Sequence, residues 1–296
     1  MRTPPATARG ARFQILFASV LWGTTGTAQA LAPAGTTPLG VASVRVCMGG
    51  FALFLIGWGR GLLRDRHMSL VHILAAAGSL VAAQLSFFAA VDRTGVAVGT
   101  VVAIGSSPIA AGVLAWLIRR ERPGRRWALA TTVGVTGAVL LLAAGRAVDV
   151  DPAGVGLALI VGLGYAGYIV ATKDLVDEHP PDAVTAAVFG VAATVILPLL
   201  FVADLGWAAD PKGLAIALHL GLVTVAFAYS IFSRGLIVVP AAVAVTLTLA
   251  EPLTAGILGV VVLDERLSMV AVLGILLVLA SLVLLTVPAR DRAAST

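Results

Sequence analysis

Residues Val239–Leu263 read VPAAVAVTLTLAEPLTAGILGVVVL, a stretch long enough to cross a lipid bilayer that contains one charged residue, Glu251. A spanning helix needs about 20 apolar residues, and a carboxylate at mid-depth costs roughly 3 kcal/mol on insertion scales. Pro252 follows directly and cannot donate a hydrogen bond to the carbonyl of Thr248, which predicts a bend beside the charge. Secondary transporters place their substrate and ion sites at such broken helices. The stretch therefore predicts a membrane protein with a functional site around Glu251.

A second stretch with the same features lies 144 residues earlier in the chain. It runs over Gly95–Ile118 and carries no charge, and its Pro108 corresponds to Pro252 (252 − 108 = 144). The step Glu121-Arg122 after it corresponds to Glu265-Arg266 with the same offset (265 − 121 = 144). A proline, an acid-arginine step and apolar runs that all match in register indicate an internal duplication.

The composition places the whole chain in a membrane. Of its 296 residues, 59% are hydrophobic and 12% are charged, whereas soluble domains carry about 25% charged residues. The mean hydropathy is +1.02 and the sequence pI is near 10.1. In a soluble protein this pI would suggest nucleic acid as a partner, but here the positions of the basic residues explain it. The single cysteine, Cys47, excludes an intrachain disulfide.

Hydropathy predicts an all-α integral membrane protein with ten transmembrane helices. The expected spans are Phe13–Leu31, Pro38–Trp58, Leu70–Val91, Gly95–Ile118, Trp127–Ala144, Pro152–Thr172, Ala183–Val202, Gly213–Phe232, Val239–Leu263 and Met269–Val287. They form two five-helix repeats, residues 13–145 and 152–287. Because five is an odd number, the second repeat is expected to be inverted in the membrane relative to the first.

The basic residues predict which side faces the cytoplasm. If the N-terminus is cytoplasmic, 15 of the 20 Lys and Arg residues lie in inward segments, four lie in outward loops and Arg45 lies within a span. This asymmetry follows the positive-inside rule and predicts a multi-pass plasma-membrane protein, in a bacterium the inner membrane, with both termini cytoplasmic. The segment Lys173–His179 is the weak point, because it is predicted inward yet is net acidic.

The ordered set of these motifs resembles the EamA branch of the drug/metabolite transporter superfamily. The resemblance rests on the duplicated five-helix unit, Trp22-Gly23, Arg45, Glu251-Pro252 and the closing run Asp264–Ser268, and it covers essentially the whole chain. It implies a carrier with a central cavity between two inverted halves. Many members export amino acids, and the chain is similar to the YddG-type exporters of aromatic and other neutral amino acids, although no motif singles out that subgroup.

Two charges inside the spans each have two interpretations. In the functional interpretation, Glu251 binds a substrate ammonium group or a coupling proton. In the structural interpretation, it is protonated or bonded within the helix bundle on a kinked helix. Arg45 either meets a substrate carboxylate or pairs with Glu251, or it extends its long side chain toward a helix end and bonds loop carbonyls. For Arg45 the structural interpretation is preferred, because it lies only about two turns from Pro38.

A pocket for an amphipathic solute needs aromatic walls and a few polar groups. The candidates for substrate contact are Trp22, Thr25, Gln84, Phe87, Phe88, Ser107, Tyr165, Tyr168, His219, Tyr229, Thr248 and Glu251. Pro108 and Pro252 are candidate hinges. The alternative for an aromatic residue is a place in the belt at the membrane surface, which is predicted for the tryptophans at span ends. These are Trp58, Trp116, Trp127 and Trp207.

The residues and the resemblance together predict a secondary transporter that exports neutral or aromatic amino acids, or related small amphipathic metabolites, by alternating access. The alternatives are a drug or other metabolite carrier of the same fold, a non-transporting membrane receptor, and an intramembrane enzyme. The sequence has no Walker-type loop, nucleophile elbow or metal-ligand spacing, so no enzymatic activity, cofactor or metal is expected. The expected partners are the substrate, the lipid bilayer and, as an open alternative, protons. No nucleic acid is expected, and a monomer is preferred over a homodimer.

Overall fold

The computed structural model describes residues 7–64, 67–143, 151–264 and 268–286, with the backbone alone at residues 88, 91, 92, 95–98, 142 and 143. Within these residues the regular secondary structure is entirely helical. The α-helices are α1 (Ala8–Ala30), α2 (Pro38–Gly59), α3 (Leu70–Arg119), α4 (Arg125–Ala143), α5 (Pro152–Glu178), α6 (Pro181–Ile196), α7 (Pro211–Leu218), α8 (Ala228–Leu236), α9 (Ala241–Leu247), α10 (Ala250–Leu263) and α11 (Met269–Thr286). Short 3₁₀ segments are η1 (Leu62–Arg64), η2 (Leu197–Phe201) and η3 (Gly206–Ala209), and a π-helix, η4 (His219–Phe227), joins α7 to α8.

Helix starts follow local sequence signals. The hydroxyl of Thr37 accepts a hydrogen bond from the amide of Gly40 before α2, and the carboxylate of Asp151 accepts one from Ala153 before α5. Such side chains satisfy amide groups that have no partner in the first helical turn. Proline stands in the first turn of α2, α5, α6 and α7, where its missing N–H costs nothing.

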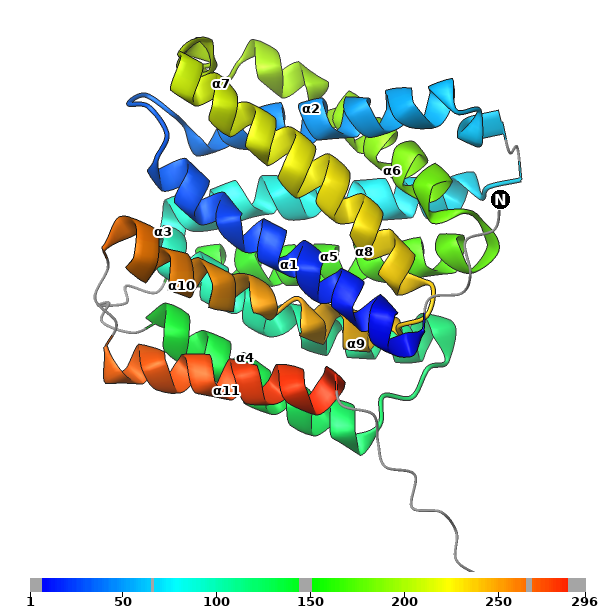
Figure 1. Cartoon of the computed structure of the whole chain (residues 1–296), viewed down its shortest axis with the longest axis vertical. Helices are drawn as coiled ribbons and strands as arrows, with labels where there is room; N and C mark the ends of the chain where they lie inside the picture. The colour runs from blue at the N-terminus through cyan, green and yellow to red at the C-terminus, as the bar shows by residue number, and fades with distance from the viewer. Residues whose placement is uncertain (1–6, 65–66, 144–150, 265–267, 287–296) are drawn as a thin grey trace, which may run out of the picture.

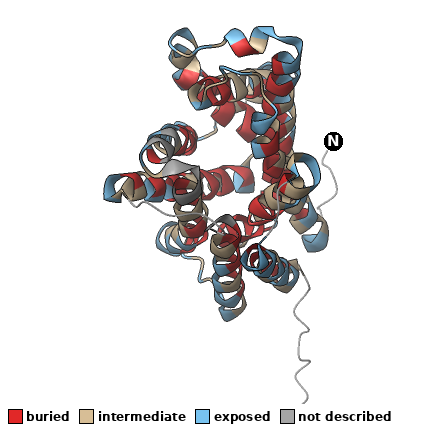
Figure 2. Cartoon of the chain, turned by 90° about the vertical axis from the view of Figure 1, so that its left-hand side faces the viewer, coloured by how far each residue is buried: buried red, intermediate tan, exposed pale blue. Residues whose placement is uncertain are grey.

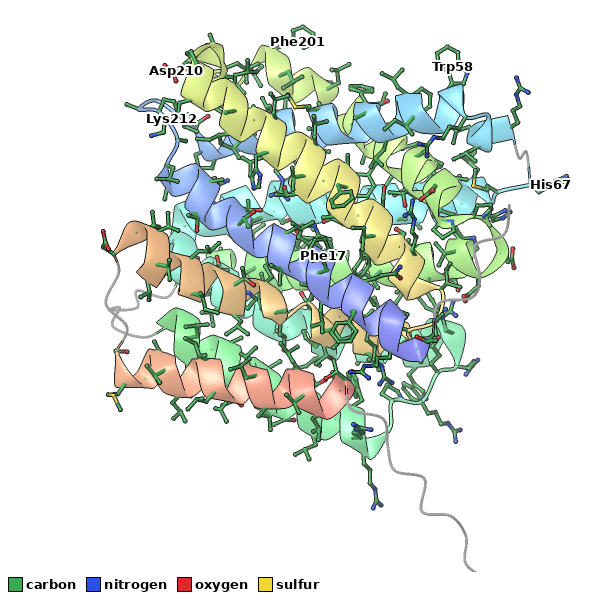
Figure 3. All side chains as sticks on the ribbon, viewed as in Figure 1. Phe17, Trp58, His67, Phe201, Asp210 and Lys212 are labelled. Atoms are coloured by element: carbon green, nitrogen blue, oxygen red, sulfur yellow. The ribbon has the colours of Figure 1, made fainter. Side chains whose placement is uncertain are left out.

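Eight helical segments of the described chain are long and apolar enough to cross a membrane. They are Pro38–Gly59, Leu70–Phe87, Gly99–Arg119, Pro152–Glu178, Pro181–Phe201, Pro211–Leu236, Ala241–Leu263 and Met269–Thr286. The chain is therefore an all-helical, multi-pass membrane protein. Large apolar side chains such as Phe17, Trp58 and Phe201 are exposed on its outer faces (Figure 3). The end that holds His67 is called the His67 end below, and the opposite end, with Asp210 and Lys212, the Asp210 end.

Helix α3 folds back on itself, although its helical assignment is continuous over 50 residues. A Cβ atom added at Gly164 of α5 would meet Ala83, and one added at Gly162 would meet the carbonyl of Ala103. In a straight helix Ala83 and Ala103 would be about 30 Å apart. The two arms of α3 therefore flank α5, and Ala83 and Ala103 belong to one small apolar cluster with Val161.

The stretch around Glu251 is a broken helix. Helix α9 ends at Leu247 and α10 begins at Ala250, and the amide of Glu251 donates to the carbonyl of Thr248 at 2.9 Å across the break. The break lies one turn before Pro252, where the proline removes a helical hydrogen bond. The equivalent Pro108 lies inside α3 without interrupting its helical assignment.

The first helix of each predicted repeat packs into the other repeat. Helix α1 packs against α8, η4 and α10, and α5 packs between the arms of α3, while α2 pairs with α6 and α4 with α11. We call α1, η4, α8 and α10 the α1 bundle, and α3 with α5 the α5 bundle. Helix α1 runs from the His67 end to the Asp210 end, and α5 runs the opposite way (Figure 1). Buried residues gather where the helices face one another (Figure 2).

Candidate functional site

Five aromatic rings from four helices meet in the interior. Trp22 of α1 lies 4.6 Å from Tyr229 and 5.2 Å from Phe232 of α8, measured between ring centroids. Phe189 of α6 lies 4.5 Å from Tyr229, and Tyr168 of α5 completes the group at 5.7 Å from Tyr229 and 6.0 Å from Phe189. All five side chains are buried. Because these rings come from both bundles and from α6, they form an aromatic cluster at the junction of the helices, in the geometries that aromatic pairs prefer.

Trp22 is fixed in this cluster by a hydrogen bond. Its indole N–H donates to the carbonyl of Thr224 in η4 at 2.9 Å. A π-helix pairs each amide with the carbonyl five residues earlier, and such segments occur frequently at functional sites. The next residue, Gly23, brings α1 close to α10, because an added Cβ would lie 2.7 Å from the carbonyl of Glu251 and 2.5 Å from the Cβ of Thr254.

Arg45 and Glu251 lie near the cluster without forming a direct ion pair. Arg45 is within electrostatic range of Glu251 and Tyr165, and Tyr229 is within range of both charges. No carboxylate described in the structure lies within 4.0 Å of Arg45. The Nε of Arg45 and the hydroxyl of Thr25 are buried and have no hydrogen-bond partner among the described residues. Since buried polar groups are normally hydrogen-bonded, these atoms are available to a polar ligand.

The structure brings some predicted site residues together and uses others elsewhere. Trp22, Tyr168 and Tyr229 meet in the aromatic cluster. Phe87 and Tyr165 each pack against the small apolar cluster of α3 and α5. Two hydroxyl groups bond within their own helical segment: Ser107 donates to the carbonyl of Ala103 and Thr248 donates to that of Val245. His219 of η4 forms a hydrogen bond with Thr24 of α1 at 2.8 Å, and Gln84 is buried in α3. The side chain of Phe88 lies outside the described residues.

Two members of the aromatic cluster were not predicted. Phe232 follows Tyr229 by three residues, so both rings lie on one face of α8, and this spacing is a signal that the sequence carries. Phe189 stands among alanines and valines in α6, and no pattern in the sequence distinguishes it from a lipid-facing phenylalanine.

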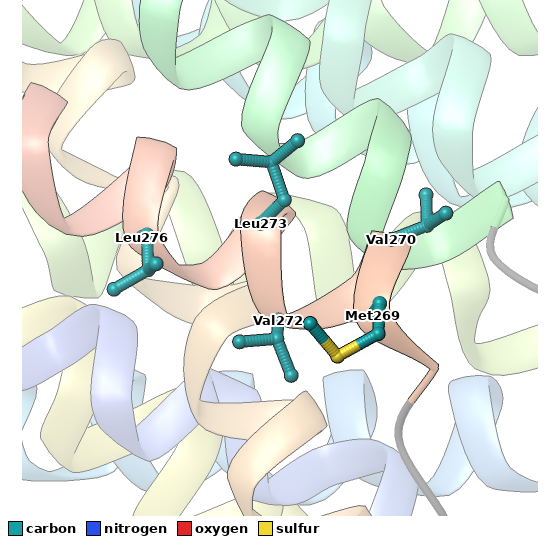
Figure 4. A pocket seen from close by; sticks show the side chains of 5 residues that line it. All are labelled: Met269, Val270, Val272, Leu273 and Leu276. Atoms are coloured by element: carbon teal, nitrogen blue, oxygen red, sulfur yellow. The ribbon is translucent and has the colours of Figure 1, made fainter.

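Two hollows lie away from this site. One, of about 430 Å³, is lined by Met269, Val270, Val272, Leu273 and Leu276 on the outer face of α11 (Figure 4). Its lining is apolar and has no polar group that could orient a solute. The other, of about 240 Å³, lies at the His67 end and is lined by Ser69, His72, Asp174, Leu175, Asp177, Glu178 and His179. Within the described chain, no group of three or more His, Cys, Asp or Glu residues is arranged to hold a metal ion.

The fold and sequence match known proteins over nearly their whole length. The chain is 42% identical over 278 residues to the uncharacterized transporter YwfM of Bacillus subtilis, which covers 94% of each protein. It is 22% identical to the uncharacterized inner membrane transporter YicL of Salmonella typhimurium, over 96% of this chain and 98% of that protein. A crystal structure with 20% sequence identity superimposes with a TM-score of 0.79 over 93% of this chain and 97% of the other, which shows a shared fold.

The family match covers both predicted repeats. The model of the EamA-like transporter family matches residues 11–143 and again residues 152–287. This family is part of the drug/metabolite transporter superfamily. Together with the membrane-spanning helices and the transporter relatives, the double match identifies the chain as a membrane transporter of the EamA-like transporter family.

Proposed function

We propose that the protein exports neutral or aromatic amino acids, or closely related amphipathic metabolites, by alternating access through a site between Arg45, Glu251 and the aromatic cluster. The observation that carries this proposal is that Arg45 and Glu251 lie within electrostatic range of each other but form no ion pair within 4.0 Å. A zwitterion could satisfy both charges at once, with its carboxylate at Arg45 and its ammonium group at Glu251. The apolar side chain of the cargo would then lie against Tyr165, Tyr229 and Trp22.

This arrangement suits a zwitterion better than a cargo with one charge. A substrate with only a carboxylate would leave the charge of Glu251 without a partner. A substrate with only an ammonium group would leave the charge of Arg45 without one. Burying an unpaired charge is costly. A phosphate ester would need more than one nearby cation, and Arg45 is the basic residue among those described that lies in range of Glu251. A drug carrier of the same fold remains the second candidate, because aromatic walls also bind uncharged rings.

We further propose ten membrane crossings in two inverted repeats, residues 13–145 and 152–287, with both termini in the cytoplasm of a bacterial inner membrane. The two family matches support the repeats. The opposite directions of α1 and α5 support the inversion, as do the pairing of α2 with α6 and of α4 with α11, because each pair joins equivalent helices. In this orientation the His67 end is cytoplasmic, in line with its excess of arginine.

Alternating access would then move the α1 bundle against the α5 bundle. Each bundle contains helices from both repeats, so the moving bodies would not coincide with the repeats themselves. The aromatic cluster takes rings from both bundles, and its packing would change as they move. The proposed hinges are Pro252, at the break between α9 and α10, and Pro108. Broken helices absorb such motion in carriers. At Pro108, where α3 is not interrupted, the missing N–H of the proline weakens the helix.

Counterflow in liposomes tests the proposal. Purified protein is reconstituted into vesicles loaded with one unlabelled solute, and the entry of labelled phenylalanine is measured against protein-free vesicles. We expect loading with neutral amino acids to drive uptake, and loading with phenylethylamine or phenylpropionate, which each lack one charged group, to drive little. Equal exchange by all three solutes would refute recognition of the zwitterion. No exchange of any amino acid would refute the proposed cargo and favour a drug carrier, a receptor or an enzyme.

A further inference from the structure

A buried lysine lies toward the His67 end of α5, about one and a half turns beyond Tyr168 of the aromatic cluster. Lys173 is 7% exposed, and its ammonium group donates to the carboxylate of Asp177 at 2.6 Å and to the carbonyl of Ile237 at 2.9 Å. The second carboxylate oxygen of Asp177 accepts from Arg119 at 2.7 Å. Arg119 also bonds Glu121 and Asp174, so Asp177 is held in place from the end of α3.

The bond from Lys173 to Ile237 joins the two bundles. Lys173, Asp177 and Arg119 belong to the α5 bundle, whereas Ile237 directly follows α8 of the α1 bundle. Its carbonyl lies at the C-terminal end of a helix, where acceptors lack helical partners and a positive charge is favoured. Lys173 thus supplies a cation to a helix end that belongs to the other bundle.

The opposite end of the molecule differs. The polar contacts described there stay within one bundle: Arg93 meets Asp151 at 3.6 Å between α3 and α5, and Thr24 meets His219 at 2.8 Å between α1 and η4. At the His67 end, in contrast, Lys173 of α5 bonds the residue that follows α8, and one turn earlier Tyr168 of α5 bonds Ser233 of α8.

We propose that Lys173 is the latch of the cytoplasmic gate: its hydrogen bond to Ile237 holds the two bundles together at the cytoplasmic end and breaks each time this end opens. The proposal rests on the alternating access proposed above. Asp177 makes the latch reversible, because it compensates the charge of Lys173 when the bond to Ile237 is broken. Arg119 keeps Asp177 in place. The same contacts explain why the acidic segment Lys173–His179 lies at this end, since Arg119 and Lys173 hold Asp174 and Asp177.

Distances across the two ends test the latch. In a Cys47→Ala background, one spin-label pair is placed at Glu178 and Val238 at the cytoplasmic end, and another at Ala153 and Lys212 at the opposite end; all four positions are exposed. Pulsed dipolar spectroscopy in lipid nanodiscs then gives the populations of open and closed conformers. For Lys173→Met we expect the ratio of cytoplasm-open to cytoplasm-closed molecules to rise about tenfold, which corresponds to about 1.4 kcal/mol. The distance at the opposite end should shorten in the same molecules.

Arg234→Gln is the matched control, because it removes a positive charge at the same end. Arg234 pairs with Asp182 of α6, so this ion pair does not link the α1 bundle to the α5 bundle. We expect its distance distributions to match those of the parent protein. An equal shift in Arg234→Gln would mean that any lost charge loosens this end, and it would overturn the latch. Unchanged distances in Lys173→Met would overturn it as well.

A second variant covers the case in which Lys173→Met does not assemble. Asp177→Asn keeps the lysine but weakens its anchor, so we expect a smaller shift in the same direction, and no shift would overturn the proposal. Counterflow of labelled phenylalanine is measured on the same preparations. If labelled phenylalanine is not exchanged but the distances change as expected, the proposed cargo is rejected and the latch is supported. Failure of the proposed cargo can therefore be distinguished from failure of the latch.

Discussion

Gly23 should be intolerant of even one added carbon, whereas Gly26 on the same helix should accept it. A Cβ at Gly23 would lie 2.5 Å from the Cβ of Thr254 and 2.7 Å from the carbonyl of Glu251, and one at Gly26 would meet nothing within 4 Å. Carbon atoms pack best at about 3.5–4.0 Å, so Gly23→Ala requires α1 and α10 to separate by about 1 Å. The contact is with backbone and a β-branched side chain, which cannot turn aside.

The expected magnitudes have opposite signs. Replacing a helical glycine by alanine stabilises a helix by about 0.5–1 kcal/mol, which is the whole expected effect at Gly26. Overpacking costs about 1–3 kcal/mol, so Gly23→Ala should be destabilised despite the better helix former. At about 2–4 °C per kcal/mol, the two variants should differ in Tm by several degrees.

Thermal unfolding of the purified variants in detergent gives the Tm, and counterflow in liposomes gives transport. Gly23→Ala should also lose exchange, because the separation falls next to Trp22 and Glu251, whereas Gly26→Ala should exchange like the wild type. A Gly23→Ala protein as stable as Gly26→Ala would refute the close approach of α1 and α10 on which the candidate site depends.

Three more substitutions probe the candidate site. Arg45→Gln should weaken the apparent affinity for neutral amino acids about tenfold or more, since a charge-assisted hydrogen bond contributes about 1.5–3 kcal/mol. Competition by phenylethylamine, which has no carboxylate, should not weaken. An equal loss of affinity for both solutes would contradict a contact between Arg45 and the carboxylate. In the same competition assay, Glu251→Gln should weaken the apparent affinity for amino acids but not that for their N-acetyl derivatives. An unchanged rate and pH profile of exchange in this variant would exclude a role of Glu251 in proton coupling. Trp22→Phe leaves the carbonyl of Thr224 without its indole donor and should lower the Tm by several degrees, whereas Trp58→Phe, at an exposed position, should leave it unchanged.

The sequence identified the helices better than their partners. The apolar runs and the break near Pro252 could be predicted because they depend on residues close together in the chain. The same rule predicts a kink at Pro108, where α3 is not interrupted, and the kink there stays a prediction. A loop was also expected between the third and fourth spans; the chain does fold back between Ala83 and Ala103, but its backbone there is helical. Proline therefore marks where a helix can break, and the surrounding packing decides whether it does.

Tryptophan shows why site residues were harder to predict. Trp58 and Trp116 are exposed, as expected for a belt at the membrane surface. The same prediction was wrong for Trp207 of η3, which is 4% exposed. For Trp127, whose indole donates to the carbonyl of Ala242, it stays a prediction. All four stand at span ends, so position along the helix could not separate them. What separates them is which neighbour covers each ring, and this depends on contacts between distant segments.

The packing of each proposed repeat's first helix into the other repeat has a consequence for synthesis in the cell. Both arms of α3 have already been synthesised when α5 leaves the ribosome. The partners of α1 in α8 and α10 are synthesised later, and the last residue of α10 follows the end of α1 by about 230 positions. At about 5–20 residues per second this wait lasts some 10 to 50 s. Helix α1 is also one of the less apolar helices, with threonine, glycine and glutamine in its second half. During that interval α1 must be kept in the bilayer by the insertion machinery or by the arginine-rich segment at its start. The unfinished chain should be most susceptible to proteolysis during the same interval.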